Sequence, residues 1–128
     1  MGWATVNSPA TLNTVNTVDF ATYTADGVAP ATTVPWDSAT ATDNAILTSS
    51  KSISGTTPFE VNSVKIAPAG SGQSLNLSGS ANLVTPAILL AGTNDYTIRA
   101  TGTGALAGTS TRFIHVDKAT LNIEASVV

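Results

Sequence analysis

The sequence predicts an all-β fold, a parallel β-solenoid with a less regular N-terminal part. Three observations support this prediction. Apolar doublets recur between Phe59 and Ile123, with the two apolar residues of each doublet two positions apart. Small and turn-forming residues, such as Ser78-Gly79-Ser80, separate the doublets. The doublets also repeat at a nearly constant distance along the chain, which is the pattern of a stacked coil.

The first fifty residues are expected to form irregular strands and loops. Trp3 to Val6 alternates apolar and polar residues, and a second strand is expected around Thr14 to Tyr23. Asp26-Gly27 is a turn signal. The stretch from Val28 to Trp36 contains two prolines, which restrict it to a loop or an edge strand. A further short strand is expected over Ile46-Leu47-Thr48.

The regular solenoid part is expected over residues 51–128. It contains six apolar doublets, which are Val64-x-Ile66, Leu75-x-Leu77, Ile88-x-Leu90, Tyr96-x-Ile98, Ile114-x-Val116 and Leu121-x-Ile123. Each doublet places both apolar side chains on one face of a strand, because successive side chains in a strand alternate between faces. No segment is long or regular enough for an amphipathic helix. We treat residues 1–128 as a single domain, with residues 1–50 as its irregular part.

The spacing between doublets indicates how the strands stack. The offsets are 24 residues from Val64 to Ile88, 23 from Leu75 to Ile98, 26 from Ile88 to Ile114 and 23 from Ile98 to Leu121. A near-constant offset of this size is what a coil of three short strands per turn produces, with each strand pairing in parallel with its equivalent one turn later. Inward side chains would then form aliphatic stacks, and outward ones would be polar.

An antiparallel β-sandwich is the alternative fold, because short strands at this spacing suit it as well. Two features favour the solenoid. The separators are small-residue linkers rather than the Asn-Gly or Asp-Gly turns of hairpins. The doublets are also shorter than typical sandwich strands.

Composition and charge exclude several partners. The net charge is -3, and the five basic residues (Lys51, Lys65, Arg99, Arg112 and Lys118) are scattered, so no phosphate-binding stripe for nucleic acid can be drawn. The longest apolar run, around residues 87–91, is far shorter than the ~20 residues of a membrane-spanning helix, so no membrane insertion is expected. The absence of cysteine excludes disulfides, Cys-ligated zinc and thiol catalysis.

No group of reactive residues predicts an enzyme. His115, the only histidine, lies between two inward residues and is expected to point outward, on the same face as Asp117. Exposed strand polarity explains both residues. Arg99, on the strand that follows Asp95, is the nearest approach to a charged cluster. We therefore expect no catalytic residue, no cofactor-binding residue and no metal ligand.

The aromatic residues separate the two fold alternatives. In the solenoid, Trp3 and Trp36 are expected to anchor the fold by burial, since burying an indole is strongly favourable. In the sandwich alternative, the protein would be a carbohydrate-binding module, and Trp3, Trp36, Tyr23 or Tyr96 would be its stacking platforms.

Several segments together carry a resemblance to a known family. They are Val61-Asn62-Ser63-Val64-Lys65-Ile66, Leu75-Asn76-Leu77, Ala87-Ile88-Leu89-Leu90, Gly92-Thr93-Asn94-Asp95-Tyr96-Thr97-Ile98, Phe113-Ile114-His115-Val116 and Thr120-Leu121-Asn122-Ile123. On these segments the chain resembles the autotransporter-associated β-strand repeat modules of large exported bacterial surface proteins. The opening Trp3-Ala4-Thr5-Val6, with Phe20-Ala21-Thr22-Tyr23, also resembles the start of such a module. The resemblance implies a right-handed parallel β-helix with a structural, stalk-like role.

The function expected from the sequence is therefore a non-catalytic structural module of an extracellular or cell-surface protein, acting as a stalk, an adhesin or a matrix or fibre element. The open ends of a solenoid present unpaired backbone groups, which favour pairing with another strand. The expected partners are thus other copies or neighbouring repeats of the same protein, joined head to tail, with a surface glycan as the alternative partner.

Overall fold

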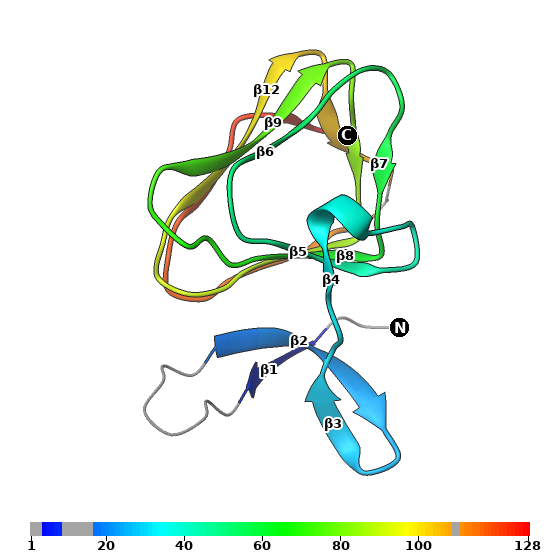
Figure 1. The fold of residues 1–128 in the computed structure, drawn as a ribbon, viewed down its shortest axis with the longest axis vertical. Coiled ribbons are helices and arrows are strands. Elements are labelled where there is room, and N and C mark those ends of the chain that lie inside the picture. Colours follow the sequence, from blue (N-terminus) through cyan, green and yellow to red (C-terminus); the bar gives the residue numbers. More distant parts are fainter. Residues whose placement is uncertain (1–3, 9–16, 109–110) are drawn as a thin grey trace.

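The computed structural model describes residues 4–8, 17–108 and 111–128. The chain winds into a parallel β-solenoid of four turns, and a small antiparallel sheet lies against one of its sides (Figure 1). Viewed from its N-terminal end, the coil runs clockwise while it recedes, so it is right-handed (Figure 1). The predicted fold class is confirmed, and the antiparallel sandwich is not what the chain adopts.

Three parallel sheets form the walls of the coil. Sheet I contains β4 (Val34–Pro35), β5 (Asn44–Leu47), β8 (Ser63–Ile66), β11 (Ala87–Leu90) and β14 (Phe113–Val116). Sheet II contains β6 (Lys51–Ile53), β9 (Gln73–Gly79), β12 (Tyr96–Gly102) and β15 (Leu121–Ile123). Sheet III contains β7 (Phe59–Glu60), β10 (Leu83–Val84), β13 (Ala105–Ala107) and β16 (Ser126–Val127). Each of the four turns therefore contributes one strand to each sheet, and β4 adds a further edge strand to sheet I before the first turn.

The register of the ladders agrees with most of the offsets seen in the sequence. Three predicted pairs are direct neighbours, namely Val64–Ile88, Leu75–Ile98 and Ile88–Ile114. The fourth pair is wrong, because Ile98 lies beside Ile123, and Leu121 lies beside Tyr96. The error is two residues, so Leu121 still has the inward orientation that the pattern predicted.

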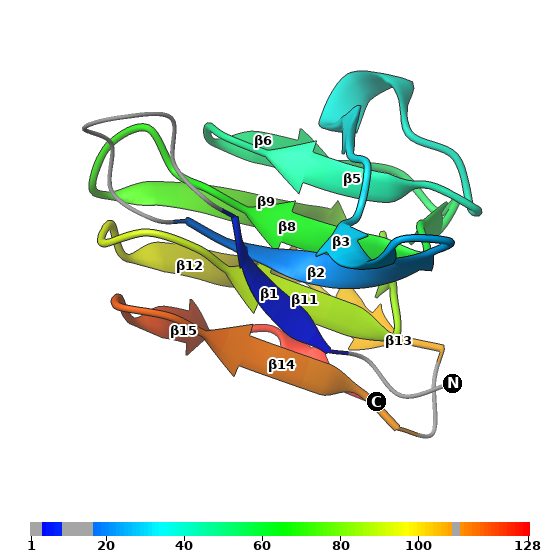
Figure 2. The same ribbon diagram turned by 90° about the horizontal axis from the view of Figure 1, so that it is seen from below.

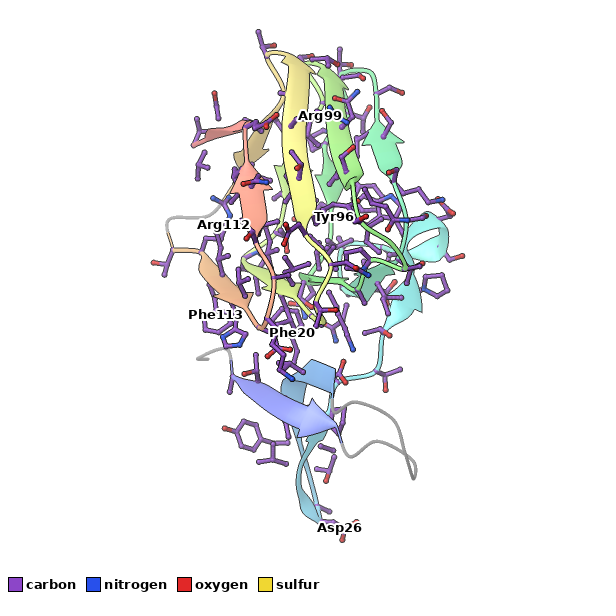
Figure 3. The ribbon with its side chains drawn as sticks, turned by 90° about the vertical axis from the view of Figure 1, so that its left-hand side faces the viewer. Phe20, Asp26, Tyr96, Arg99, Arg112 and Phe113 are labelled. Atoms are coloured by element: carbon purple, nitrogen blue, oxygen red, sulfur yellow. The ribbon has the colours of Figure 1, made fainter. Side chains whose placement is uncertain are left out.

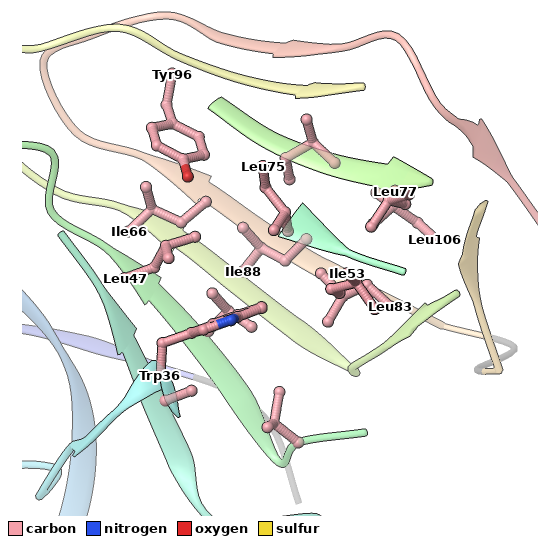
Figure 4. Packing of buried hydrophobic residues seen from close by; sticks show 14 of the residues in the cluster. Trp36, Leu47, Ile53, Ile66, Leu75, Leu77, Leu83, Ile88, Tyr96 and Leu106 are labelled. Atoms are coloured by element: carbon pink, nitrogen blue, oxygen red, sulfur yellow. The ribbon is translucent and has the colours of Figure 1, made fainter. Parts of the chain in front are cut away.

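The interior of the coil is filled by stacked aliphatic side chains. Leu47, Ile66 and Leu90 come from successive turns of sheet I, and all three are fully buried. Leu75, which Figure 4 shows in the interior, forms the equivalent stack with Ile98 on sheet II. Each of these side chains lies above its equivalent from the turn before, so one apolar core runs the length of the coil.

A stack of glycines lets the chain turn sharply between sheet II and sheet III. Gly79 and Gly102 are neighbours in successive turns, with φ of 67° and 155°. A Cβ atom on Gly102 would lie 2.3 Å from the carbonyl oxygen of Gly79. That oxygen also accepts hydrogen bonds from the backbone N–H groups of Thr103 and Gly104. No side chain fits at Gly102 unless the turns move apart.

The N-terminal sheet has the strand order β1-β2-β3 and is antiparallel. It contains β1 (Thr5–Ser8), β2 (Thr17–Thr24) and β3 (Gly27–Pro30). Strands β2 and β3 form a hairpin, with Ala25 and Asp26 in the turn, so the predicted turn signal is confirmed. Both prolines of the stretch from Val28 to Trp36 lie in edge strands, β3 and β4, as the sequence predicted.

The N-terminal sheet covers the outer face of sheet I (Figures 1 and 2). Val18 and Phe20 of β2 pack on Ala87, Leu89 and Ala91, whose side chains point away from the coil interior. Figure 3 shows Phe20 between the two sheets, while the hairpin tip at Asp26 extends away from the coil. This cover explains why β11 is apolar at four consecutive positions, since a strand buried on both faces needs apolar residues on both.

Candidate functional site

The residues that sequence analysis considered for chemistry do not come together. The ladder places His115 beside Leu89, on the outer face as expected, where its ring stacks on Phe113 with 6.3 Å between centroids. Among the described residues, the His115 ring and the Asp117 carboxylate form no hydrogen bond with each other. In that part of the chain, no group of three or more His, Cys, Asp or Glu side chains could hold a metal ion.

Arg99 and Asp95 have structural roles in the coil. Arg99 Nη2 donates to Ser74 Oγ at 2.8 Å, and this bond joins the neighbouring strands β12 and β9 of sheet II. Asp95 Oδ1 accepts from the backbone N–H of Thr120 at 2.7 Å, which joins the third turn to the fourth. The two charged residues are four positions apart on an extended segment, so their Cα atoms are about 13 Å apart.

The other basic side chains also hold parts of the structure together. Lys65 forms a buried ion pair with Asp19, which connects sheet I to the N-terminal sheet. Arg112 donates to the carbonyl oxygens of Thr85 and Ala107 and so fixes the corner before β14. The charged ends of Lys65, Arg99 and Arg112 therefore bind groups of the protein itself.

Two of the four aromatic residues that could stack on a carbohydrate are buried. Trp36 is 6% exposed, and Tyr96 is 1% exposed inside the coil. The Tyr96 hydroxyl donates to the carbonyl oxygen of Ser49 at 3.0 Å, and burial raises the pKa of this hydroxyl. Tyr23 is 73% exposed on the hairpin, and Trp3 lies outside the described residues. Trp36 and Tyr96 are thus core residues and not stacking platforms.

The outer face of sheet II is a polar surface bound together by short side chains. Asn76 Nδ2 donates to Ser78 Oγ at 3.1 Å and to Thr101 Oγ1 at 3.3 Å. The hydroxyls of Ser78 and Thr101 are 3.4 Å apart. These contacts link the second and third turns from outside, while the aliphatic stacks link them from inside.

The N-terminal end of the coil is closed by a short cap. A 3-10 helix, η1 (Trp36–Ser38), lies across this end, as Figure 1 shows. Figure 4 shows the indole of Trp36 among the core side chains. This indole stacks on the ring of Phe59, with 4.3 Å between centroids and 19° between planes. The loop that leads from η1 to β5 is held by Asp43, whose carboxylate accepts from the hydroxyl and the backbone N–H of Thr40, at 2.8 Å each. These bonds lower the pKa of Asp43.

A shallow hollow of about 340 Å³ lies beside this cap. Its lining includes Trp36, Ile46 and the ion pair between Asp37 and Lys51. The Lys51 Nζ atom is 2.6 Å from Asp37 Oδ2, and both side chains are partly or largely exposed. The N-terminal end thus presents a charged rim around a buried indole.

Among the described residues, no further turn follows β14, β15 and β16 at the C-terminal end of the coil. Ile114 and Val116 have the same inward orientation as Ile88 and Leu90, one turn earlier. Ile88 and Leu90 are fully buried, whereas Ile114 is 42% and Val116 is 36% exposed. Val127 of β16, which lies beside the buried Leu106, is 57% exposed. Within the described chain, the inward side chains of the last turn are therefore less covered than those of the turn before it, and β14, β15 and β16 are the outermost strands of their sheets.

Within the described residues, the two ends of the coil differ in how far their inward side chains are covered. The sequence did not predict the difference between them, because Trp36 and Phe59 are 23 positions apart and neither belongs to a doublet.

Comparisons with protein-family models, with curated proteins and with solved structures find no match. No helix among the described residues is long and apolar enough to cross a membrane.

Proposed function

We propose that this chain is a non-catalytic structural module of an exported bacterial protein, of the autotransporter-associated β-strand repeat kind. It acts outside the cell or on its surface, as a stalk, an adhesin or a matrix or fibre element. Its partners are other copies or neighbouring repeats of the same protein.

One observation carries this proposal. The parallel ladders of three sheets run along the coil axis without interruption through four turns. Aliphatic stacks fill the interior, and hydrogen-bonded polar side chains such as Asn76 and Thr101 join neighbouring turns on the outside. A repeat architecture of this kind transmits force along its axis, because each turn contacts only its neighbours and many weak contacts act in parallel.

Two measurements test the proposal. In cells of the source organism, an antiserum against the chain should label intact cells or the medium, and protease added outside should remove the signal. Signal that appears only after lysis contradicts an exported role. In single-molecule pulling between the two termini, the coil should open turn by turn at forces well above those that stretch an unfolded chain. Extension with no such resistance contradicts the structural role.

A further inference from the structure

We propose that the side chains of Lys65 and Asp19 condense into an amide, so that a covalent cross-link joins the N-terminal sheet to the second turn of the coil. The ion pair between them is the state from which this bond forms. The inference goes beyond the proposed structural role, because it assigns a modification to two named residues. Its test does not depend on where the protein acts.

The fold holds the two reacting groups in contact. Lys65 lies in β8, and Asp19 lies in β2, the strand that covers the outer face of sheet I. The Nζ atom of Lys65 bonds directly to Oδ1 of Asp19, although the two residues are 46 positions apart in the chain. Groups that a structure holds in a reactive orientation have effective molarities of about 10⁵–10⁸ M, so the two strands supply most of the entropy that the reaction requires.

The surroundings of the pair are apolar. In the ladder of sheet I, Lys65 lies between Ile46 and Leu89, and Asp19 lies between the buried residues Val18 and Phe20 of β2. Only 11% of the Lys65 side chain and 12% of the Asp19 side chain are exposed. Separated charges are costly in such a place, and transfer of one proton from the ammonium to the carboxylate removes both charges. The products of that transfer, a neutral amine and a carboxylic acid, are the two reactants of amide formation.

The condensation is complete with these two side chains. The nitrogen lone pair of Lys65 forms a bond to Cγ of Asp19, the bond between Cγ and the hydroxyl oxygen breaks, and the hydroxyl group leaves with a proton from the nitrogen as water. No atom is oxidised or reduced. The product is an uncharged amide in place of a buried ion pair, and the low exposure of the site protects this amide from hydrolysis.

The second ion pair among the described residues provides a matched comparison. Lys51 and Asp37 are also in direct contact, but 33% and 72% of their side chains are exposed. Water stabilises both charges there and competes for the carboxyl carbon, so this pair should stay ionic. Burial is therefore the property that separates the pair that condenses from the pair that does not.

The mass of the denatured full chain tests the proposal. The purified protein should be lighter than its sequence by one water molecule. Lys65→Arg keeps a cation opposite Asp19, but the guanidinium stays protonated and is not a nucleophile, so this variant should have the full mass of its sequence. Asp19→Ala should also have its full mass. Circular dichroism shows whether both variants keep the fold.

Peptide mapping locates the bond. A protease that cleaves after Lys and Arg should fail at Lys65 and yield a branched product in which residues 1–51 are joined to residues 52–99. Cleavage after Lys51 should proceed normally, because that amine stays free. In single-molecule pulling, the unchanged chain should extend about 160 Å less than Lys65→Arg, since the 46 positions inside the cross-link cannot stretch by ~3.5 Å each.

Two results overturn the inference. One is a full mass for the unchanged protein after prolonged incubation in the folded state. The other is a loss of water that mapping assigns to residues other than Lys65 and Asp19. Neither result affects the surface-labelling test of the proposed function.

Discussion

Two isoleucines that share one inward position in successive turns give the most informative pair of substitutions. Ile88 is fully buried, and Ile114, its direct neighbour in the ladder, is 42% exposed. Replacing either with alanine removes the same three carbon atoms. The chemistry of the two changes is therefore identical, and the difference between them reports burial alone.

The expected losses differ several-fold. Three buried carbons are worth about 2.4 kcal/mol at ~0.8 kcal/mol each, and the cavity left in a closed core raises the total for Ile88→Ala to about 2–5 kcal/mol. For Ile114→Ala, only the buried 58% of the side chain counts and no closed cavity forms, so about 1 kcal/mol is expected.

Urea unfolding followed by circular dichroism measures both losses. The denaturant slope should match that of the unchanged protein, so that midpoints convert to free energies. Equal losses for the two variants would refute the reasoning, since they would place Ile88 and Ile114 in equivalent surroundings.

Three further predictions follow from the packing and the charges. Gly102→Ala should lower the free energy of unfolding by about 1–3 kcal/mol or more, because the added Cβ atom would overlap the backbone of Gly79. Gly70→Ala is the control, since a Cβ atom there meets nothing within 4 Å, and it should leave the free energy of unfolding nearly unchanged in the same urea assay. Lys65→Met removes the cation of a buried ion pair and should lower the free energy of unfolding by about 3–5 kcal/mol. Lys51→Met breaks an exposed pair and should change the free energy of unfolding by no more than about 1 kcal/mol. Similar losses for the two variants would contradict the burial of the pair between Lys65 and Asp19. Because burial raises the pKa of the Tyr96 hydroxyl, the unfolded chain releases this proton first, so the free energy of unfolding should fall as pH rises above about 10. Tyr96→Phe should weaken that decline in alkaline melts, and an unchanged decline would assign it to other groups.

The strands of two of the three parallel sheets could be located from the sequence. The six doublets map onto sheets I and II, where inward and outward residues alternate over at least three positions. Three strands per turn were predicted, but no doublet located the strands of sheet III, because these strands, such as Leu83–Val84, are too short to show alternation. The one register error is at Leu121, which pairs with Tyr96 and not with Ile98. It arose because the number of residues between β14 and β15 differs from that in the earlier turns, and the alternation within a strand does not specify the length of a connection.

The start of the coil and its side cover depended on long-range contacts. Strands β4 and β5 pair into sheet I, so the first strands of the coil lie within the part that sequence analysis treated as irregular. The outer apolar residues of β11 signalled a cover, but nothing local to them indicates that Val18 and Phe20 supply it. Contacts of this kind depend on which two surfaces pack together, and the residue pattern along one strand does not predict its packing partner.

The candidate site was the least predictable part of the structure. Open ends were expected of any solenoid, and the backbone argument for pairing treats both ends alike. The difference between them comes from Trp36, which covers one end by stacking on Phe59. At the other end, Ile114 and Val116 continue the aliphatic pattern with no following turn in the described chain, so their exposure becomes visible only once the turns are stacked.

The parallel stacking of successive turns is tested most directly by interstrand nuclear Overhauser contacts around Ile98. The structure predicts that the backbone protons of Ile98 contact those of both Leu75 and Ile123, in the staggered pattern of parallel ladders. Close Hα–Hα contacts between Ile98 and a strand running in the opposite direction would contradict it.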